Sequence, residues 1–578
     1  MSGNPYFDNM FRNALFAFLL IGLVGTIYYL LFRNDYPSGQ RDIANGHGHF
    51  NTYCSSCHGL EEDGIGPPLG GITELIPSEP LIKFIRNPSQ VISSGDKRAV
   101  RQLARYKQVM PSFDWMDEKM IREILGYISH QTKLYHITPE HVGESGTGLT
   151  GRLVASVKKS DLKIELEDVI QIPRLEGTSP DLGIVTLRPH PSGDGTFFVS
   201  DQSGVIYHVR NDNAHIFLDI RKHIKDFQSG PGIATGIGSF DFHPDYLNNG
   251  LIYVTHAETF KGQTPDYLVS DSIRAEVQWV IGEWKMDDIT NLAFSGKHRE
   301  MLRLHAPTFA HGCQDIRFIP GIEKTNSDYG LLYIGYGDGG SNNIRRPELG
   351  HHLKSFLGTI MRLDPAGTNS PNGKYGIPND NPFVNESDPG VIKEIYAFGF
   401  RNPHRMEWDE KANYRMIVTD IGEANIEEIN IVEKGGDYGW PNREGNFGIA
   451  TTRDMKTVYK LENSDVDRFK GPLAQYDHED GNAIGGGFLY DGKIEPLKNK
   501  YIFGDIVNGK LFYMNFNPQL TDSIIYELTI VYKGKKTSLQ KMSGIKRVHQ
   551  RIGYDRFNKI LYVITKADGM IRRISAAY

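Results

Sequence analysis

A pentapeptide near the N-terminus, Cys54-Ser-Ser-Cys57-His58, limits the possible folds of this chain more than any other feature. Two thiols three positions apart can each bond to a vinyl group of haem, and the histidine that follows can ligate the iron. A zinc site would need two further Cys or His residues at ligand spacing, and a redox dithiol would need a βαβ setting. The surrounding sequence offers neither, so we predict haem c attached to Cys54 and Cys57, with His58 as an iron ligand.

The sequence around this motif resembles class I cytochrome c. Three segments are similar, in order, to that family's first helix, its loop over the haem edge and its closing helix: Gly46–Tyr53, Gly64–Leu69 and Asp117–His130. The resemblance implies that Met110, followed by Pro-Ser-Phe, is the second axial ligand of the iron. Met116 and Met120 are the alternatives, although a methionine near a helix more often fills a core. We expect residues 43–133 to form a small all-α cytochrome c domain.

The segment Ala14–Phe32 is apolar and carries no charge. At a rise of about 1.5 Å per residue, such a helix nearly matches a hydrocarbon layer of ~30 Å. A cleaved signal peptide is the alternative, but the run is long for one and no small-x-small site follows it. We predict a cytoplasmic tail over 1–12 and a single transmembrane anchor over 13–32. Because haem c is attached outside the cytoplasm, the remainder is expected in the periplasm, at the inner membrane.

Composition separates the remaining segments. A polar tether over 33–42 precedes the haem domain, and a stretch rich in Gly, Ser and Thr indicates a linker within 134–160.

The 64 basic and 70 acidic residues nearly balance, which gives no electrostatic case for binding nucleic acid. With two of three cysteines assigned to haem, Cys313 has no disulfide partner, and a lone thiol is usually buried packing.

From residue 161 to the C-terminus, short runs of β-branched and aromatic residues alternate with turns of Gly, Asp and Asn. The clearest runs are Thr196–Ser200, Val205–Val209, Leu251–Thr255, Leu331–Gly335, Phe488–Tyr490, Lys510–Tyr513 and Ile560–Ile564. No helical pattern separates these strands. The region 161–578 is therefore predicted to be a large all-β domain, either a propeller or an array of sandwiches.

The same region resembles the soluble aldose sugar (glucose/sorbosone) dehydrogenase family. Seven blocks follow that family's order: Phe240–Asp245 with Asn248–Tyr253, His311 ahead of Ile316–Phe318, Tyr333–Gly340, Leu357–Asp364 with Gly376–Pro382, Ile395–Pro403, Asp420–Asn430 and Gly435–Pro441. The resemblance implies a six-bladed propeller that holds pyrroloquinoline quinone (PQQ) near its axis, supported by calcium. It also implies oxidation of the anomeric hydroxyl of aldoses to lactones.

The resemblance assigns roles to individual residues. His311 would be the base that removes the hydroxyl proton, for which an imidazole is suited near neutral pH. His305 is the nearest alternative. Arg401, beside Asn402, would hold a quinone oxygen or carboxylate with its rigid fork of donors.

Four further positions match the family's calcium sites. These are Gly422 and Glu423 at a cofactor-side ion, and Glu428 and Tyr438 at a second ion. Oxygen ligands on a turn suit Ca²⁺, although a solvated acidic turn is the alternative.

The chain departs from the family pattern at four places, one of which is Cys313–Asp315, where the family prefers glycines after the base. Ala234-Thr235-Gly236 stands where the family has a glutamine, and Ile506–Gly509 stands where some members place a lysine against the quinone carboxylates. The family's paired C-terminal arginines align loosely with Arg547 and His549, which are predicted to bind the cofactor.

Together these features predict a membrane-anchored quinohaemoprotein. A sugar or related polyol would be oxidised with PQQ, and haem c would pass the electrons to a respiratory acceptor such as a membrane oxidase or another cytochrome. The alternative is a non-catalytic propeller that serves as a scaffold or binding module beside an electron-transfer cytochrome. A propeller lactonase that uses calcium alone would leave the haem without a role.

Overall fold

The computed structural model describes residues 36–37, 39–55, 57–60, 66–106, 108–134, 137, 149, 151–173, 183–230, 234–269, 273, 275–344, 346–449, 455–461, 468–566 and 568–578. The anchor expected over 13–32 lies outside these residues. Among the helices that are described, none has the length and apolar character needed to span a membrane. The chain divides into two compact units, residues 1–144 and 145–578.

The first unit is helical. Its described helices are α2 (Gln40–Tyr53), α3 (Ile72–Leu75), α4 (Ser78–Arg86), α5 (Pro88–Ser93), α6 (Lys97–Tyr106) and α7 (Glu118–Leu134). Helices α2 and α7 cross closely at Gly46, where a Cβ atom would lie 2.0 Å from the carbonyl oxygen of Glu123. Phe50 of α2 and Ile124 of α7 belong to the core of this unit. The expected first and closing helices are therefore confirmed.

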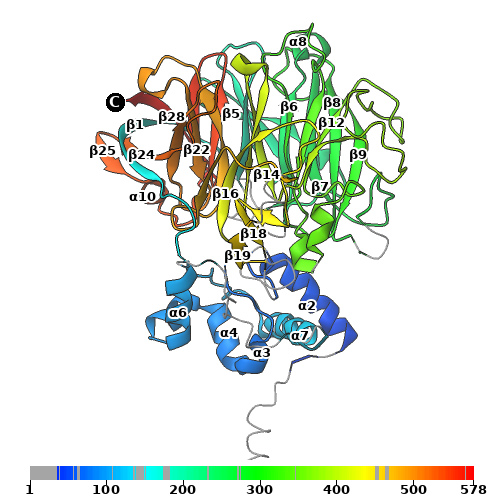
Figure 1. Cartoon of the computed structure of the whole chain (residues 1–578). Coiled ribbons are helices and arrows are strands. Elements are labelled where there is room, and N and C mark those ends of the chain that lie inside the picture. Colours follow the sequence, from blue (N-terminus) through cyan, green and yellow to red (C-terminus); the bar gives the residue numbers. More distant parts are fainter. Residues whose placement is uncertain are drawn as a thin grey trace, which may run out of the picture. The chain divides into compact units, whose positions relative to one another are not determined.

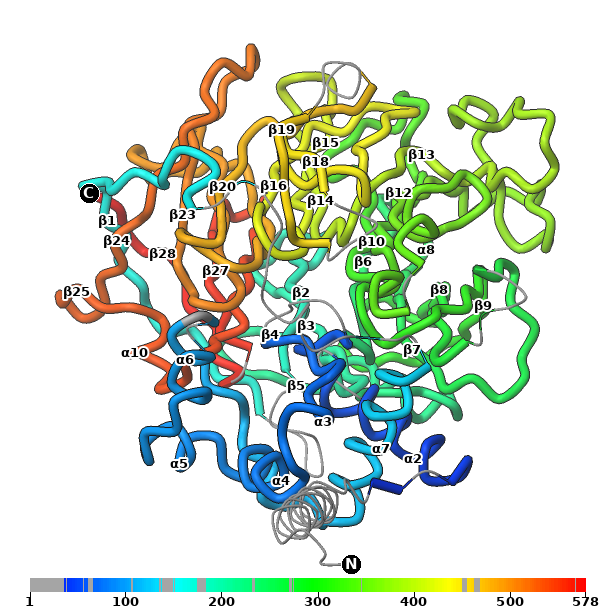
Figure 2. The backbone as a smooth tube through the Cα atoms, turned by 60° about the horizontal axis from the view of Figure 1, so that its bottom comes forward, coloured from blue at the N-terminus to red at the C-terminus, as the bar shows by residue number. Residues whose placement is uncertain are grey.

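The second unit contains antiparallel four-stranded sheets arranged in sequence order around a ring (Figures 1 and 2). The first three blades are β2 (Ile184–Pro189), β3 (Phe197–Asp201), β4 (Val205–Arg210) and β5 (Asn213–Asp219); β6 (Ile237–Phe242), β7 (Leu251–Thr259), β8 (Val277–Met286) and β9 (Gly296–Ala306); and β10 (Cys313–Phe318), β11 (Leu332–Tyr336), β12 (Thr359–Leu363) and β13 (Ile395–Phe398).

The remaining blades contain the C-terminal strands. They are β14 (Pro403–Asp409), β15 (Arg415–Asp420), β16 (Ile426–Val432) and β20 (Ala474–Asp477); β21 (Ile484–Tyr490), β22 (Lys500–Asp505), β23 (Leu511–Asn515) and β24 (Ile525–Tyr532); and β26 (Gln550–Asp555), β27 (Ile560–Thr565), β28 (Met570–Ala577) and β1 (Lys158–Gln171). Each of the seven runs predicted as strands falls largely within one of these strands.

Strand β1 closes the ring. It pairs antiparallel with β28 and so completes the sixth blade, and it also pairs parallel with β24 of the fifth blade. The innermost strands β2, β6, β10, β14, β21 and β26 each contact the next around the ring. The all-β prediction is confirmed, and the architecture is the propeller rather than the sandwich array.

Short elements extend the blades. They are β17 (Arg443–Glu444), β18 (Phe447–Ile449), β19 (Val458–Lys460), β25 (Lys535–Thr537), α8 (Tyr246–Asn249), α10 (Leu539–Ser543) and the 3₁₀ turns Ile220–Lys222, Ser341–Ile344, Pro347–Gly350, Glu410–Ala412 and Glu495–Leu497. The end of the expected linker also belongs to this unit, because Arg152 forms ion pairs with Asp477 at 3.3 Å and Asp480 at 2.6 Å.

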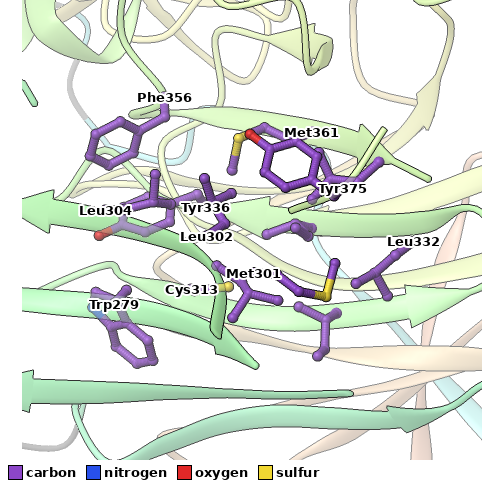
Figure 3. Close-up of a cluster of buried hydrophobic side chains, with 14 of the residues drawn as sticks. Trp279, Met301, Leu302, Leu304, Cys313, Leu332, Tyr336, Phe356, Met361 and Tyr375 are labelled. Atoms are coloured by element: carbon purple, nitrogen blue, oxygen red, sulfur yellow. The ribbon is translucent and has the colours of Figure 1, made fainter. Parts of the chain in front are cut away.

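The largest apolar cluster packs blade two against blade three (Figure 3). Trp279 and Leu304 come from blade two, and Tyr336 and Met361 from blade three. Cys313 is fully buried in this cluster, and burial raises the pKa of its thiol to about 12. The thiol is therefore a packing element, as the sequence suggested.

Candidate active site and haem site

The six innermost strands of the propeller begin at one end of the ring, because each follows the same direction through its blade. In an antiparallel sheet the first strand begins at the end where the second strand finishes. His311 and Arg401 lie just before the innermost strands β10 and β14, and Asp338 and Glu423 follow the second strands β11 and β15. The topology thus gathers these side chains at one end of the central channel.

His311 forms a close pair with Asp338. The Nδ1 atom of the imidazole lies 2.7 Å from Oδ1 of the carboxylate, whose side chain is 1% exposed, against 22% for His311. A proton on Nδ1 donated to this carboxylate fixes the ring in one tautomer and leaves the lone pair of Nε2 free. This is the arrangement that a general base requires.

The backbone of His311 adopts a left-handed conformation, with φ of +45°. This conformation is uncommon outside glycine, and neighbouring residues must leave room for it. A Cβ atom on Gly337 would lie 2.5 Å from the carbonyl oxygen of His311, and one on Gly312 would lie 2.1 Å from Nε1 of Trp279. The two glycines therefore allow the close approach that places His311 against Asp338.

Asp338 is held by two donors to its carboxylate besides His311, and by one hydrogen bond that its own backbone amide donates. Trp440 Nε1 donates to Oδ2 at 3.1 Å, the Gly340 amide donates to Oδ1 at 2.9 Å, and the Asp338 amide donates to the carbonyl oxygen of Arg401 at 2.7 Å. Burial alone would raise the pKa of this carboxyl, but His311, Arg401 and the Gly340 amide lower it below the ordinary value. Asp338 is therefore a charged orienting group for His311.

Arg401 is anchored beside this pair. Its Nε donates to Oε2 of Glu423 at 2.6 Å and its guanidinium lies 5.7 Å from the ring centre of Trp440. Burial opposes the charge, but Glu423 and Asp338 outweigh it and raise the pKa of Arg401. The guanidinium is thus permanently charged near Asp338, and its role in holding a quinone oxygen or carboxylate stays a prediction.

Asn402 follows Arg401 at the same end of the channel. Its amide donates to Oδ1 of Asp420 at 2.6 Å, and the Arg401 amide donates to Oδ2 at 3.0 Å. Burial and the neighbouring Glu428 raise the pKa of Asp420. The side-chain oxygen of Asn402 is buried without a hydrogen-bond partner among the described residues, so it is available to a bound molecule.

His305, the alternative base, lies elsewhere. It belongs to β9, the outermost strand of the second blade, and its ring packs against Phe260 at 4.6 Å between centroids. Its position far from the innermost strands favours His311 as the base.

Arg547 and His549 lie just before β26, also at the start of an innermost strand. Arg547 Nε and His549 Nδ1 are buried with no hydrogen-bond partner in the described part of the chain. Orphaned buried donors of this kind fit an anionic molecule such as PQQ, because such groups are rarely left unpaired.

The four calcium candidates do not present a free shell of side-chain oxygens. Glu423 is paired with Arg401, and Glu428 accepts from Asn430 Nδ2 at 3.0 Å and from the amide of Gly445. Tyr438 donates its hydroxyl to the carbonyl oxygen of Ile431 at 2.7 Å. No group of three His, Cys, Asp or Glu residues able to hold a metal occurs among the described residues. Calcium through the backbone oxygens of Gly422 and Glu423 stays a prediction.

The first unit builds a site suited to haem. His58 is 9% exposed, and its Nδ1 lies 2.7 Å from the carbonyl oxygen of Pro67, to which it can donate. That bond leaves Nε2 free for iron. A Cβ atom on Gly66 would lie 2.2 Å from Cε1 of His58, so the loop presses closely on the ring. The backbone of His58 donates to the carbonyl oxygen of Cys54 at 2.9 Å, which places the motif on one turn.

The three candidate methionines of this unit differ in how deeply their side chains are buried. Met116 is 2% exposed in the helical core and Met120 packs against that core, whereas Met110 is half-buried in the loop between α6 and α7. Met110 thus stays the predicted axial ligand.

Asp338 and Trp440 were not predicted as parts of the site, although both stand within the sequence blocks that resemble the family. Asp338 follows a predicted strand and precedes two glycines, a position typical of a functional turn. Its proximity to His311 depends on the antiparallel pairing of β10 with β11, which the sequence pattern alone does not reveal.

Comparisons with known proteins agree with this architecture. A family model described as glucose/sorbosone dehydrogenase matches residues 187–536, and a cytochrome c model matches residues 43–132. HIPL1 protein of Arabidopsis thaliana is 26% identical over 368 residues, which are 56% of this chain and 51% of that protein. Quinoprotein glucose dehydrogenase B of Acinetobacter calcoaceticus is 26% identical over 328 residues, which are 53% of this chain and 60% of that protein. The chain thus spans roughly half to three-fifths of these relatives.

A solved structure shows the same fold. The crystal structure of the soluble aldose sugar dehydrogenase of Escherichia coli in its apo-form superposes with a TM-score of 0.50 at 17% identity, covering 71% of this chain and 98% of that chain. Because the family model matches more than half of the chain, the protein belongs to the glucose/sorbosone dehydrogenase family and carries a cytochrome c domain at its N-terminal side.

Proposed function

We propose that this protein oxidises an aldose or a related sugar alcohol with PQQ and passes the electrons through its own haem c. The observation that carries the proposal is the pair His311–Asp338 beside Arg401 at the channel end of the propeller. Family membership supports it, as does the relative named a quinoprotein glucose dehydrogenase. The cytochrome c domain also supports it, because this chain then carries its own electron acceptor and does not depend on a separate carrier for the first transfer.

The residues of the site divide the chemistry between them. Nε2 of His311 accepts the proton of the sugar hydroxyl, and Asp338 stabilises the imidazolium that forms. Arg401 supplies positive charge where negative charge develops, and Asn402 offers an unpaired oxygen to a bound group. When bound, PQQ supplies a two-electron acceptor and haem c a one-electron carrier. Cys54, Cys57, His58 and Met110 would hold the haem.

The proposal includes a place in the cell. The apolar run Ala14–Phe32 supports a single anchor in the inner membrane, and a haem c motif supports a periplasmic position for both domains. A membrane oxidase or another cytochrome is then the expected acceptor. Calcium bound near Gly422 and Glu423 is part of the proposal, but no step above depends on it.

The variant His311→Asn tests the catalytic assignment. Asparagine tolerates the left-handed backbone of this position, so the fold should persist. We expect aldose oxidation, measured with an artificial electron acceptor after PQQ and Ca²⁺ are added, to fall by about a hundredfold or more, because the base is lost.

His305→Asn is the matched control, since that histidine lies on an outermost strand. It should retain activity. Equal activity of His311→Asn and the unaltered protein would refute the assignment, and failure of the unaltered protein to oxidise any aldose would refute the proposed function.

A further inference from the structure

A cluster of buried and half-buried basic side chains lies at the channel end of the propeller, and among the described residues it forms no ion pair with an acidic side chain. It consists of Arg405, Arg547, Arg551 and Lys566, together with the imidazoles of His404 and His549. Lys566 is 1% exposed, Arg551 6% and His404 2%. In the part of the chain that the structure describes, none of these arginines and lysine forms an ion pair.

Their hydrogen bonds go to neutral acceptors. Lys566 Nζ donates to the side-chain oxygen of Gln202, and Arg405 donates to the carbonyl oxygens of Gln314 at 2.6 Å and Val185 at 2.9 Å. The Nε atom of Arg551 is buried without a partner among the described residues, as are Arg547 Nε and His549 Nδ1. Burying several positive charges together, with some of their N–H donors unpaired, costs free energy of folding unless an anion binds to them.

The cluster is contiguous and belongs to the candidate active site. The amide of Lys566 donates to the carbonyl oxygen of His549 at 3.3 Å, which joins the turn after β27 to the start of β26. His404 and Arg405 lie at the start of β14, shortly after Arg401 in the sequence. Gln314 lies at the start of β10, shortly after His311. The cations therefore line the same end of the channel as the proposed base.

The pKa shifts of the cluster residues support the interpretation that this cluster binds an anion. Burial and the neighbouring arginines lower the pKa of Lys566 well below its ordinary value, and burial with the surrounding cations does the same for His549. Asp201 acts favourably on Lys566 but forms no ion pair with it among the described residues, and its Oδ1 accepts from the Ser203 amide at 2.7 Å. The protein alone does not neutralise the ammonium.

The position of Lys566 also explains a departure from the family pattern. Where some members place a lysine on the turn of the fifth blade, this chain has Val507, which is 5% exposed and apolar. Lys566 occupies the equivalent turn, between the second and third strands, of the next blade. A cation is thus present at the same end of the channel from a different blade.

We propose that Lys566 binds a carboxylate of the quinone cofactor and replaces the missing lysine, with Arg547 and Arg551 completing the anion site and Gln202 positioning the ammonium. The proposal rests on the proposed function, because it takes PQQ as the anion. It assigns cofactor binding to a position outside the family's motif blocks.

Titration of PQQ into the full-length apo-protein, followed by isothermal calorimetry, tests this assignment without reference to activity. Lys566→Met should weaken PQQ binding by about tenfold to a hundredfold, the range expected for one charge-assisted hydrogen bond. Thermal unfolding of the apo-protein should show a midpoint kept or raised, because methionine removes an uncompensated buried charge. Lys566→Gln, which keeps a polar partner for Gln202, provides a second variant if the methionine variant does not fold.

Lys559→Met is the control, since Lys559 pairs with Asp491 on the turn at the other end of β26. It should bind PQQ as the unaltered protein does. Equal PQQ affinity in all of these proteins would overturn the role of Lys566 and leave the proposed function standing. No binding of PQQ to the unaltered protein would overturn the proposed function and the assignment that rests on it.

Discussion

The chemistry of the site depends on the orientation of one imidazole. His311 contacts Asp338 through Nδ1, and three groups besides His311 hold or stabilise that carboxylate: Trp440, the Gly340 amide and the guanidinium of Arg401. Because the pKa of Asp338 lies below the ordinary value, the carboxylate stays charged from that low value upward. Orientation of the base should therefore persist over the whole neutral range.

Asp338→Asn tests this orienting role. The amide can present its NH₂ group to Nδ1, which favours the wrong tautomer, and it removes the charge that stabilises the imidazolium. We expect the turnover number for aldose oxidation to fall by about a hundredfold or more.

The control is Asp555→Asn, a buried aspartate that caps the turn between β26 and β27 at the opposite end of its blade. This variant should keep the turnover number. An Asp338→Asn protein with the turnover number of the unaltered protein would show that the carboxylate does not orient the base.

The sequence predicted the haem motif from a short local pattern, and it predicted His311 and Arg401 from the ordered blocks that resemble the family. It did not predict Asp338 or Lys566 as site residues, because their roles come from pairing between strands and blades. Gln202 and Lys566 illustrate the difficulty, since their side chains meet although they lie 364 positions apart. No local pattern specifies such a contact.

At the scale of elements, strand β1 determines whether the propeller is closed. It lies before the residues matched by the family model, yet it completes the last blade by pairing with β28. Ile164 and Leu166 of β1 are buried in the cluster between the last two blades. The sequence indicated strands from about residue 161 but did not show that this strand pairs with the C-terminus.

Ile164→Ala tests the contribution of this closure. The side chain is 0% exposed, so its removal leaves a cavity, and we expect the free energy of unfolding to fall by about 2–5 kcal/mol. Asp161→Ala, at an exposed position of the same strand, should change it by less than about 0.5 kcal/mol. Chemical denaturation followed by tryptophan fluorescence measures both. Equal stabilities of the two variants would show that β1 does not hold the ring together.

Buried ion pairs between innermost strands add to this closure. Arg188 of β2 lies 3.0 Å from Asp315 of β10, and Arg317 of β10 lies 3.7 Å from Glu407 of β14. Breaking one partner would leave an uncompensated buried charge, which is strongly destabilising. These pairs join blades along the channel, whereas the arginines and Lys566 of the cation cluster form no ion pair among the described residues.

For the whole molecule, the proposed function places both the oxidation site and the first electron acceptor in one chain. The two compact units are joined covalently, so transfer between them would be intramolecular. An intramolecular process has a first-order rate constant that does not change with protein concentration, whereas the observed rate constant for transfer between separate molecules rises with concentration.

The most direct test follows the haem absorbance after an aldose is mixed, without oxygen, with the PQQ-loaded full-length protein over a tenfold range of protein concentration. We predict that the haem is reduced with an observed first-order rate constant that is the same at every concentration. Haem that stays oxidised while an added acceptor is reduced, or an observed rate constant that rises in proportion to concentration, would refute intramolecular transfer.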